Sequence, residues 1–407
     1  MQVVVIGSGI GGLTAAIALR RRGHRVLVVE QARAAGEVGA GLQVPPNATR
    51  LLRELGVLDA LRRTAVQPRL RIVRQGGDGV EIHRRELGAA VERSSGAPYL
   101  VLHRVDLLEA LLTAARSDDG AGEPVVIEFG QRVDGIDELA GGVRVHAESG
   151  RTWTADAVIG ADGIHSFVRR TIGESDQPVY SGESMWRALV PADVLAPDLR
   201  AIAGLEGPST NIWAGPGRHV VNYPLRSGEL VNIAATIPGP EVEESYLTAG
   251  RVEDMVASYE GWDPRLLRLL GSAPQVKLWP LFVREPLPHW TAGRVGLLGD
   301  AAHPMLPHQA QGSAQAVEDA IVVAEVLTGA EGDVPAALAR YEALRRPRAS
   351  AVQLAAVRSG RTWALTEQEQ LAARAAELQT MGGNAGAITY DWLWDGSPSE
   401  APVAASA

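Results

Sequence analysis

The sequence predicts a mixed α/β fold that combines a Rossmann-like domain with a second, sheet-containing domain and a C-terminal helical segment. Three features support this prediction: β-branched runs that end in glycines and lead into helical stretches, aromatic strand-like segments between residues 180 and 274, and mostly helical spacing after residue 335. With 407 residues, of which 46% are apolar and 21% charged, the chain is long enough for two to three packed units.

Domain boundaries follow from where these patterns change. Residues 1–69, 97–175 and 276–340 are expected to form the Rossmann-like domain, and residues 70–96 and 176–275 the second domain. Residues 341–395 are expected to form the helical segment, and the Ser-, Pro- and Ala-rich residues 396–407 a disordered tail.

The composition argues against several classes of protein. A net charge of −9 without a long basic run indicates no nucleic-acid partner. The absence of cysteine excludes disulfides, thiolate catalysis and iron–sulfur ligation. The sequence shows no signal peptide and no apolar span of about 18 residues, which predicts a cytoplasmic protein with no membrane association.

The first 30 residues carry a dinucleotide-binding fingerprint. Gly7, Gly9 and Gly12 lie between a strand at residues 3–6 and a helix at residues 13–22, and Glu30 follows the next strand. In this context Gly7 makes the tight turn, Gly9 lets the backbone approach a pyrophosphate, and Gly12 allows close helix–strand packing. Glu30 is expected to accept hydrogen bonds from ribose hydroxyls.

A second stretch, residues 294–320, combines a strand, an acidic turn and a helix start. Asp300 follows the apolar strand 295–298, where a side chain can be presented to a ligand. Pro304 and Pro307 prevent a helix until about Gly312, after which residues 313–327 have helical composition. The N–H groups at this helix start can face an electron-rich ligand, although an ordinary surface turn would have the same pattern.

Several motifs together indicate a family. Four short motifs occur in chain order. The first two are HRVDL at residues 103–107 and Gly160-Ala161-Asp162-Gly163. The next is Gly299-Asp300-Ala301-Ala302-His303-Pro304, which is followed by Gly312 and by Glu318-Asp319-Ala320. In this order they resemble the single-component FAD-dependent aromatic hydroxylases of the p-hydroxybenzoate hydroxylase-like superfamily. The resemblance implies bound FAD, NADH or NADPH as a transient co-substrate, and oxygen activated at the flavin C4a position.

The resemblance also implies roles for individual residues. Asp300 would bond the ribityl chain, N–H groups of Gly312, Ser313 and Ala314 would face the flavin ring, and Leu42 and Gln43 would lie beside it. Arg104 would lie near the flavin phosphates or ribityl chain, Val133 near the adenine, and Asp162 near both FAD and the nicotinamide. Without the resemblance, residues 36–46 are equally a plain loop, Arg104 a surface charge at a helix start, and Asp162 part of a common Asp-Gly turn.

His219 and Tyr223 are the predicted catalytic pair. A phenol reacts better with an electrophilic oxidant after losing its proton, so a base near the ring is needed. The two residues are four apart in a strand-like segment, which points both to one face. Their His-x3-Tyr-Pro pattern resembles the branch acting on salicylate, 3-hydroxybenzoate and 6-hydroxynicotinate. The alternative is a core tyrosine beside a satisfied histidine. His219 has no neighbouring carboxylates, so no metal site is predicted.

Other candidates carry weaker signals. His303 is expected to hold the turn, and His308 could touch the ring substituents. Arg187 and Arg218 could pair with a substrate carboxylate, but no spacing argument selects between them. The tryptophans at 186, 213 and 279 could line an aromatic pocket, although tryptophans along strands are more often core.

The predicted function is FAD-dependent hydroxylation of a small phenolic or heteroaromatic acid of the salicylate, aminohydroxybenzoate or hydroxybenzoate type, by a monomer or homodimer. Residues 186–191 lack the WxWxIP motif of flavin halogenases. A flavin epoxidase, an antibiotic-modifying oxygenase on the same scaffold and a non-catalytic flavin redox sensor stay open. Gln31 stands where the family often has a basic residue, and Arg33 could replace it.

Overall fold

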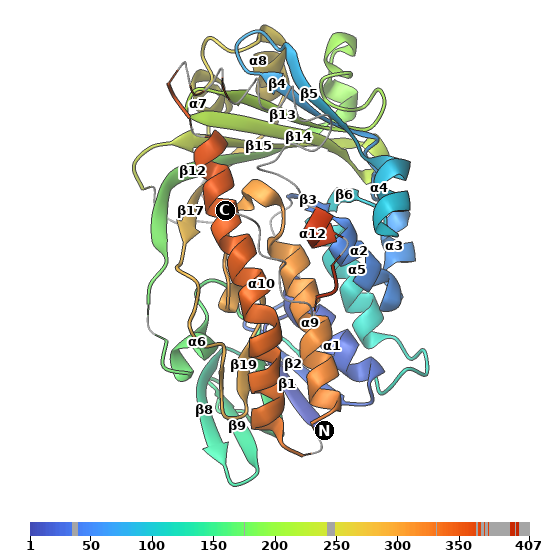
Figure 1. Cartoon of the computed structure of the whole chain (residues 1–407), viewed down its shortest axis with the longest axis vertical. Helices are drawn as coiled ribbons and strands as arrows, with labels where there is room; N and C mark the ends of the chain where they lie inside the picture. The colour runs from blue at the N-terminus through green and yellow to red at the C-terminus, as the bar shows by residue number, and fades with distance from the viewer. Residues whose placement is uncertain are drawn as a thin grey trace.

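Two large sheets organise the molecule, one in each half (Figure 1). The computed structural model describes residues 1–34, 40–174, 176–241, 249–330, 332–363, 365–367, 370, 373, 391–394 and 396–398. The predicted tail beyond residue 398 and most of the predicted segment between 364 and 390 therefore lie outside the described residues. No helix in the described ranges is long and apolar enough to cross a membrane.

The lower sheet has six strands in the order β18-β19-β11-β1-β2-β7. All neighbours pair in parallel except β18 and β19, which are antiparallel. The central strands are buried along most of their length, which explains their continuous apolar runs. The strands are β1 (Gln2–Ile6), β2 (Arg25–Val29), β7 (Val126–Glu128), β11 (Ala157–Gly160), β18 (Thr291–Ala292) and β19 (Val295–Leu297).

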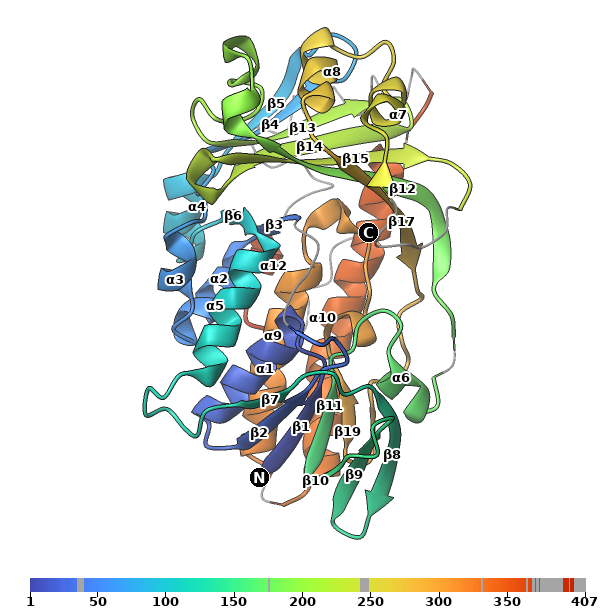
Figure 2. The ribbon, with the colours of Figure 1, turned by 180° about the vertical axis from the view of Figure 1, so that it is seen from behind.

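Helices cover one face of this sheet and a small antiparallel sheet covers the other (Figure 2). The helices are α1 (Ile10–Arg21), α5 (Arg104–Arg116), α9 (Gly312–Thr328) and α10 (Val334–Trp363), with α9 packed against both α1 and α10. The small sheet contains β8 (Val133–Leu139), β9 (Gly142–Ala147) and β10 (Thr152–Ala155). The layered arrangement matches the predicted Rossmann-like domain.

The upper sheet has eight strands in the order β16-β17-β12-β15-β14-β13-β4-β5. They are β4 (Leu70–Gln75), β5 (Glu81–Glu86), β12 (Val179–Pro191), β13 (Ser209–Gly215), β14 (Arg218–Leu225), β15 (Leu230–Pro238), β16 (Ala249–Gly250) and β17 (Val276–Val283). Helices α7 (Val252–Ala257) and α8 (Pro264–Gly271) lie on its outer side (Figure 1). Because β17 pairs with β12, this sheet extends past the boundary expected at residue 276.

The remaining elements join the two halves. Strands β3 (Gly41–Val44) and β6 (Leu100–His103) pair beside helices α2 (Pro46–Glu54), α3 (Leu58–Arg62) and α4 (Gly88–Ser95). Helix α6 (Phe167–Thr171) follows β11, and α12 (Asp391–Trp394) lies near α2. The mixed α/β fold, with a long C-terminal helix, is as predicted. Pro347 lies inside that helix, so helical composition overrode a local helix breaker.

Candidate active site

The glycine-rich turn after β1 has the geometry that its sequence predicts. Gly7 has a φ of +106°, and a Cβ there would lie 2.4 Å from the carbonyl oxygen of Ala161. A Cβ on Gly12 would lie 2.0 Å from the carbonyl oxygen of Gly7, whereas one on Gly9 would meet no atom within 4 Å. Gly7 and Gly12 therefore permit tight packing, and Gly9 leaves the backbone open to a ligand.

Glu30 lies at the tip of β2 in a cavity of about 150 Å³, which Leu108 and Glu109 of α5 also line. Its carboxylate accepts hydrogen bonds from the backbone N–H of Ser8 at 2.7 Å, the Ser8 hydroxyl at 2.9 Å and the backbone N–H of Ala32 at 2.8 Å. These bonds orient the carboxylate toward a position where a ribose could donate its hydroxyls.

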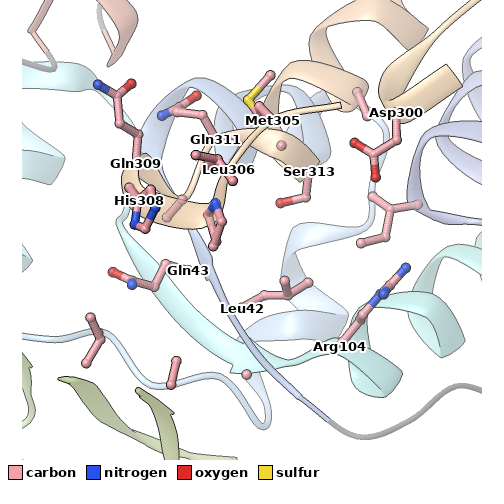
Figure 3. Close-up of a pocket in the computed structure, with 18 of the residues that line it drawn as sticks. Leu42, Gln43, Arg104, Asp300, Met305, Leu306, His308, Gln309, Gln311 and Ser313 are labelled. Atoms are coloured by element: carbon pink, nitrogen blue, oxygen red, sulfur yellow. The ribbon is translucent and has the colours of Figure 1, made fainter. Parts of the chain in front are cut away.

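A larger cavity of about 370 Å³ lies between the two sheets and shares Gly9 with the smaller one. Figure 3 shows Asp300 and Arg104 on one side of it and Gln43 and His308 on the other. A ligand that passes over Gly9 can occupy both cavities at once, which suits an extended dinucleotide. The large cavity also reaches the upper sheet, where it leaves room for a second, small ligand.

Asp300 projects into the large cavity from a short 3₁₀ turn, Gly299–Ala301. Its side chain is exposed to the cavity, but the surrounding protein keeps it from bulk water, and this burial raises the pKa of the carboxyl group. The charges of His303 and Arg104 oppose that rise. Asp300 lies where its carboxyl oxygens can accept a hydrogen bond from a ligand in the cavity, and its contact with the ribityl chain stays a prediction.

A buried carboxylate, Asp319, holds the Asp300 turn in place from behind. It accepts hydrogen bonds from the Gly299 N–H at 2.9 Å and from Arg345 Nε at 2.8 Å, and it lies 2.5 Å from His303 Nε2. Burial works to raise the pKa of Asp319, but the charges of His303 and Arg345 outweigh burial and lower it to about 2. The predicted structural role of His303 agrees with this contact.

The neighbouring Glu318 extends the network to α2 and α10. Its carboxylate accepts hydrogen bonds from Arg345 Nη1 at 2.7 Å, Arg348 Nε at 2.8 Å and Asn47 Nδ2 at 2.7 Å. Glu318, Arg345 and Arg348 are at most 2% exposed. The Glu318-Asp319 pair of the sequence motif is thus a structural anchor that joins three elements behind the ligand cavity.

Most residues predicted to contact a cofactor line one of the two cavities. Gly9, Leu42, Gln43, Arg104, Asp300, Gly312 and Ser313 line the large cavity, and Glu30 lines the small one. Ala314 is fully buried in the first turn of α9, just behind Ser313. As contacts of a bound cofactor, these residues stay predictions.

Two residues predicted to contact the cofactor, Val133 and Asp162, do not line either cavity. Val133 begins β8 and is buried, and it is not among the residues lining either cavity. Asp162 accepts hydrogen bonds from the Ser166 hydroxyl at 2.5 Å and from the Phe167 N–H at 2.7 Å, so its carboxylate holds the start of α6. Its neighbours Ala161 and Gly163 line the large cavity, so the backbone of this motif, rather than the Asp162 side chain, faces the ligand.

His219 and Tyr223 both line the large cavity from β14, together with Val221 between them. Asn222 points to the opposite face, where it accepts a hydrogen bond from Trp213 Nε1 at 3.0 Å. The predicted alternation along this strand is therefore present. Burial raises the pKa of Tyr223 against the opposing charge of Arg187, so its hydroxyl stays protonated and can donate a hydrogen bond.

Thr236 on β15 positions the His219 ring. The Thr236 hydroxyl oxygen lies 2.9 Å from His219 Nδ1 and accepts the His219 backbone N–H at 3.0 Å. It can also donate to the His219 carbonyl oxygen at 3.2 Å. When it does so, Nδ1 holds the ring proton and Nε2 is left as the base. The Nδ1 side of the His219 ring therefore faces Thr236, and the proposed base is Nε2.

The structure separates the two candidate arginines. Arg187 lines the large cavity from β12, with its guanidinium 4.9 Å from the Trp279 ring centre. In the described part of the chain no carboxylate forms an ion pair with it, and its Nε has no hydrogen-bond partner. Arg218, in contrast, is outside the cavity lining and donates a hydrogen bond to the Ser258 carbonyl oxygen.

Some lining residues were not predicted. Trp363, at the end of α10, lies 5.7 Å from the His219 ring and lines the cavity, whereas Trp186 and Trp213 are core residues of the upper sheet. Arg71 lines the cavity and donates to the Tyr99 hydroxyl at 3.0 Å, which donates to Gln43 at 2.5 Å. Nothing in their local sequence marks these residues, because they meet only in the tertiary structure.

Comparison with known proteins agrees with this geometry. A family model described as an FAD binding domain matches residues 1–356. The chain is 39% identical over 348 residues to the 3-amino-4-hydroxybenzoate 2-monooxygenase PtnB3 of Streptomyces platensis, covering 85% of this chain and 84% of that protein. It is 35% identical over 363 residues to a 3-hydroxybenzoate 6-hydroxylase of Klebsiella oxytoca, covering 89% of each.

A solved salicylate hydroxylase in complex with substrate has a similar fold, with a TM-score of 0.80 at 27% identity, covering 100% of this chain and 99% of the other. The open backbone at Gly9, the Glu30 cavity and Asp300 facing the large cavity all fit FAD. The chain therefore belongs to the FAD-binding monooxygenase family and is an FAD-dependent aromatic monooxygenase.

Proposed function

We propose that this enzyme hydroxylates a small phenolic or heteroaromatic acid, using O2 and NADH or NADPH. The observation that carries the proposal is Arg187: a guanidinium without a carboxylate partner among the described residues, on the wall of the cavity that also presents His219 and Tyr223. A charged group in such a place is best satisfied by an anionic ligand. Two relatives described above act on aminohydroxybenzoate and hydroxybenzoate, which supports a ring acid.

Each side chain then has a distinct role. Arg187 binds the substrate carboxylate, and Tyr223, whose hydroxyl stays protonated, donates a hydrogen bond to the substrate. His219 Nε2 takes the proton of the ring hydroxyl, which makes the ring more electron-rich and so more reactive toward an electrophile. When bound, FAD would supply the redox chemistry, with NADH or NADPH as reductant and O2 as oxidant.

The test is stopped-flow oxidation of NADH and of NADPH by the FAD-loaded enzyme, with salicylates, aminohydroxybenzoates, hydroxybenzoates and hydroxynicotinates. We expect one acid to accelerate oxidation and to yield hydroxylated product that matches the nucleotide consumed. If no acid accelerates it, the cavity serves a larger or less polar substrate, as in an epoxidase or antibiotic-modifying oxygenase, or the protein is a redox sensor, and the proposal is wrong.

Arg187→Met tests the carboxylate contact. Loss of a charge-assisted hydrogen bond costs about 1.5–3 kcal/mol, which corresponds to an increase in KM of about 10- to 100-fold. Arg218→Met is the matched control, because Arg218 is on the same sheet but outside the cavity lining. Equal KM values in the two variants would show that Arg187 does not bind the acid.

His219→Ala tests the base. This variant should retain FAD and substrate-accelerated flavin reduction, but divert nucleotide oxidation into hydrogen peroxide because the ring hydroxyl keeps its proton. Unchanged coupling of nucleotide oxidation to product would remove His219 from the reaction.

A further inference from the structure

A second histidine, His308, lines the cavity that contains His219. His308 lies on the 3₁₀ turn Pro307–Gln309 that precedes α9 and lines the large cavity (Figure 3). Its side chain is 0% exposed, and neither ring nitrogen has a hydrogen-bond partner among the described residues. Since a buried titratable ring without hydrogen bonds is costly, this histidine calls for a functional explanation.

His308 lies between His219 and a carboxylate. Its ring centre is 5.3 Å from that of His219, and its Nε2 is 3.2 Å from Glu183 Oε2. The Nε2 and Oε2 atoms are close but not aligned for a formed hydrogen bond, so a rotation of the Glu183 side chain can make or break the contact. Packing fixes the His308 ring, because a Cβ on Gly360 of α10 would lie 2.7 Å from it.

From His219 through His308 to Glu183, the side chains extend from the buried cavity to the protein surface. His219 is 5% exposed, the His308 side chain 0% and the Glu183 side chain 17%. Glu183 lies beside an irregularity in β12, where the pairing with β17 shifts between Tyr180 and Ser184. A proton taken up by His219 is therefore held inside the protein unless it passes to a group that reaches water, and Glu183 is such a group.

We propose that His308 and Glu183 relay the substrate proton from His219 to solvent, an inference that rests on the proposed function. The substrate O–H bond breaks and an N–H bond forms at His219 Nε2. That proton then moves to His308 Nδ1, while the proton on His308 Nε2 moves to Glu183 Oε2, which is buried, and reaches water when the Glu183 carboxyl group rotates. No electrons are transferred, and the net change is one substrate phenolate, one proton in solvent and the His308 proton on Nδ1 instead of Nε2. The reverse transfer, which returns a proton from solvent to the bound product, restores the starting tautomer of His308.

The surroundings favour this direction of transfer. On the sheet side lies Tyr259, whose hydroxyl donates to the Thr236 carbonyl oxygen at 2.6 Å and whose ring centre is 5.9 Å from the Arg218 guanidinium. Arg187 and Tyr223 line the same cavity as His308. From α10 the contacts are Gly360 and Trp363, which do not titrate. Among the described residues, Glu183 is thus the anionic group next to His308, and it stabilises a transient positive charge on that ring.

The experiment follows proton release directly. The FAD-loaded enzyme is mixed with 3-hydroxybenzoate or with 3-amino-4-hydroxybenzoate in weak buffer, at a pH where the free phenol is protonated. A pH indicator dye reports the released proton, and absorbance reports the bound phenolate. We compare Glu183→Gln and His308→Gln with Glu183→Asp, and with His146→Gln as the matched control. His146 pairs with Asp137 at 2.8 Å on the small sheet, away from the cavity.

In the wild type and in His146→Gln, proton release should keep pace with phenolate formation. Glu183→Gln and His308→Gln should slow release by about 100-fold, the lower end of what a positioned proton-transfer group contributes, with substrate affinity and FAD content unchanged. Glu183→Asp should restore part of the rate, and the pH profile of release should change in the two slow variants only.

Wild-type rates of release in both variants would overturn the relay. If His308→Gln fails to fold, Gly360→Ala displaces the ring instead, and it should slow release in the same way. If no salicylate, aminohydroxybenzoate, hydroxybenzoate or hydroxynicotinate accelerates nucleotide oxidation in the wild type, the proposed function fails and the relay fails with it. That outcome is distinct from an active wild type with unaffected variants.

Discussion

The buried pair of Asp319 and Arg345 allows a prediction of defined size. Asp319→Asn preserves the volume of the side chain but removes its charge. Both side chains are 0% exposed, so the variant leaves Arg345 to share Glu318 with Arg348. Removing one partner of a buried ion pair costs about 3–5 kcal/mol, because the other charge stays buried and loses part of its compensation. We expect the free energy of unfolding to fall by this amount at pH 7.5.

The pH dependence gives a second measure of the same interaction. The pKa of Asp319 is lowered from 3.8 to about 2, which corresponds to about 2–3 kcal/mol in favour of the charged, folded form. Because the pKa is lowered on folding, this stabilisation is fully present above about pH 4 and is lost as the pH falls toward 2. The difference between wild type and Asp319→Asn should therefore be constant from pH 7.5 to pH 5 and shrink below about pH 4.

Urea unfolding of the FAD-loaded protein, followed by far-UV circular dichroism, measures both quantities. Asp137→Asn is the control, since that carboxylate is 64% exposed and its loss should change stability by less than about 1 kcal/mol. The same variants are titrated with FAD, because Asp319 holds the turn that carries Asp300. A loss below about 1 kcal/mol in Asp319→Asn, or a difference from wild type that is unchanged between pH 5 and pH 3.5, would refute the reasoning.

Four further variants test the cofactor and substrate sides. Asp300→Ala should lose FAD during purification, and stoichiometric flavin, judged from the ratio of flavin to protein absorbance, would count against the predicted ribityl contact. Gly9→Ala should keep the unfolding free energy of the apoprotein but weaken FAD binding, because a Cβ at Gly9 meets no protein atom within 4 Å and extends into the cavity. Gly12→Ala should lower both the unfolding free energy and FAD binding, because its Cβ would lie 2.0 Å from the Gly7 carbonyl oxygen. Thr236→Val should lower the rate of product formation by about tenfold or more, with FAD content unchanged, because His219 loses the hydroxyl group that fixes its tautomer. An unchanged rate would show that another contact orients the His219 ring.

The cofactor side of the molecule was largely predictable from the sequence, for a physical reason. A dinucleotide is held by backbone groups of short contiguous loops, so the spacing of Gly7, Gly9 and Gly12 was enough to predict the tight turn and the open backbone that the structure has there. Asp300 and Gly312 do so as well, because a strand tip and a helix start are local features. The network behind them was not predictable, since the pairing of Asp319 with Arg345 depends on how α9 packs against α10.

The substrate side was predictable only where strand periodicity applies. Alternation along β14 placed His219 and Tyr223 on one face, and the structure agrees. Alternation along β12 likewise separates Trp186 from Arg187, but periodicity does not tell which face is the inner one. The choice between Arg187 and Arg218 therefore needed the structure. Trp363 comes from the end of a long helix, and no local pattern links it to His219.

The position of Arg187 has a consequence for the kind of substrate that the cavity favours. One guanidinium cannot neutralise two anionic groups. When Arg187 binds the substrate carboxylate, the negative charge of the phenolate must therefore be neutralised by another group. Protonated His219 does so only while it keeps the proton, and the outward path through His308 and Glu183 removes that charge. A neutral phenol leaves Arg187 free to stabilise the phenolate directly and does not need the path. The dependence of the rate on Glu183 should therefore be large for acids and small for the corresponding neutral phenols.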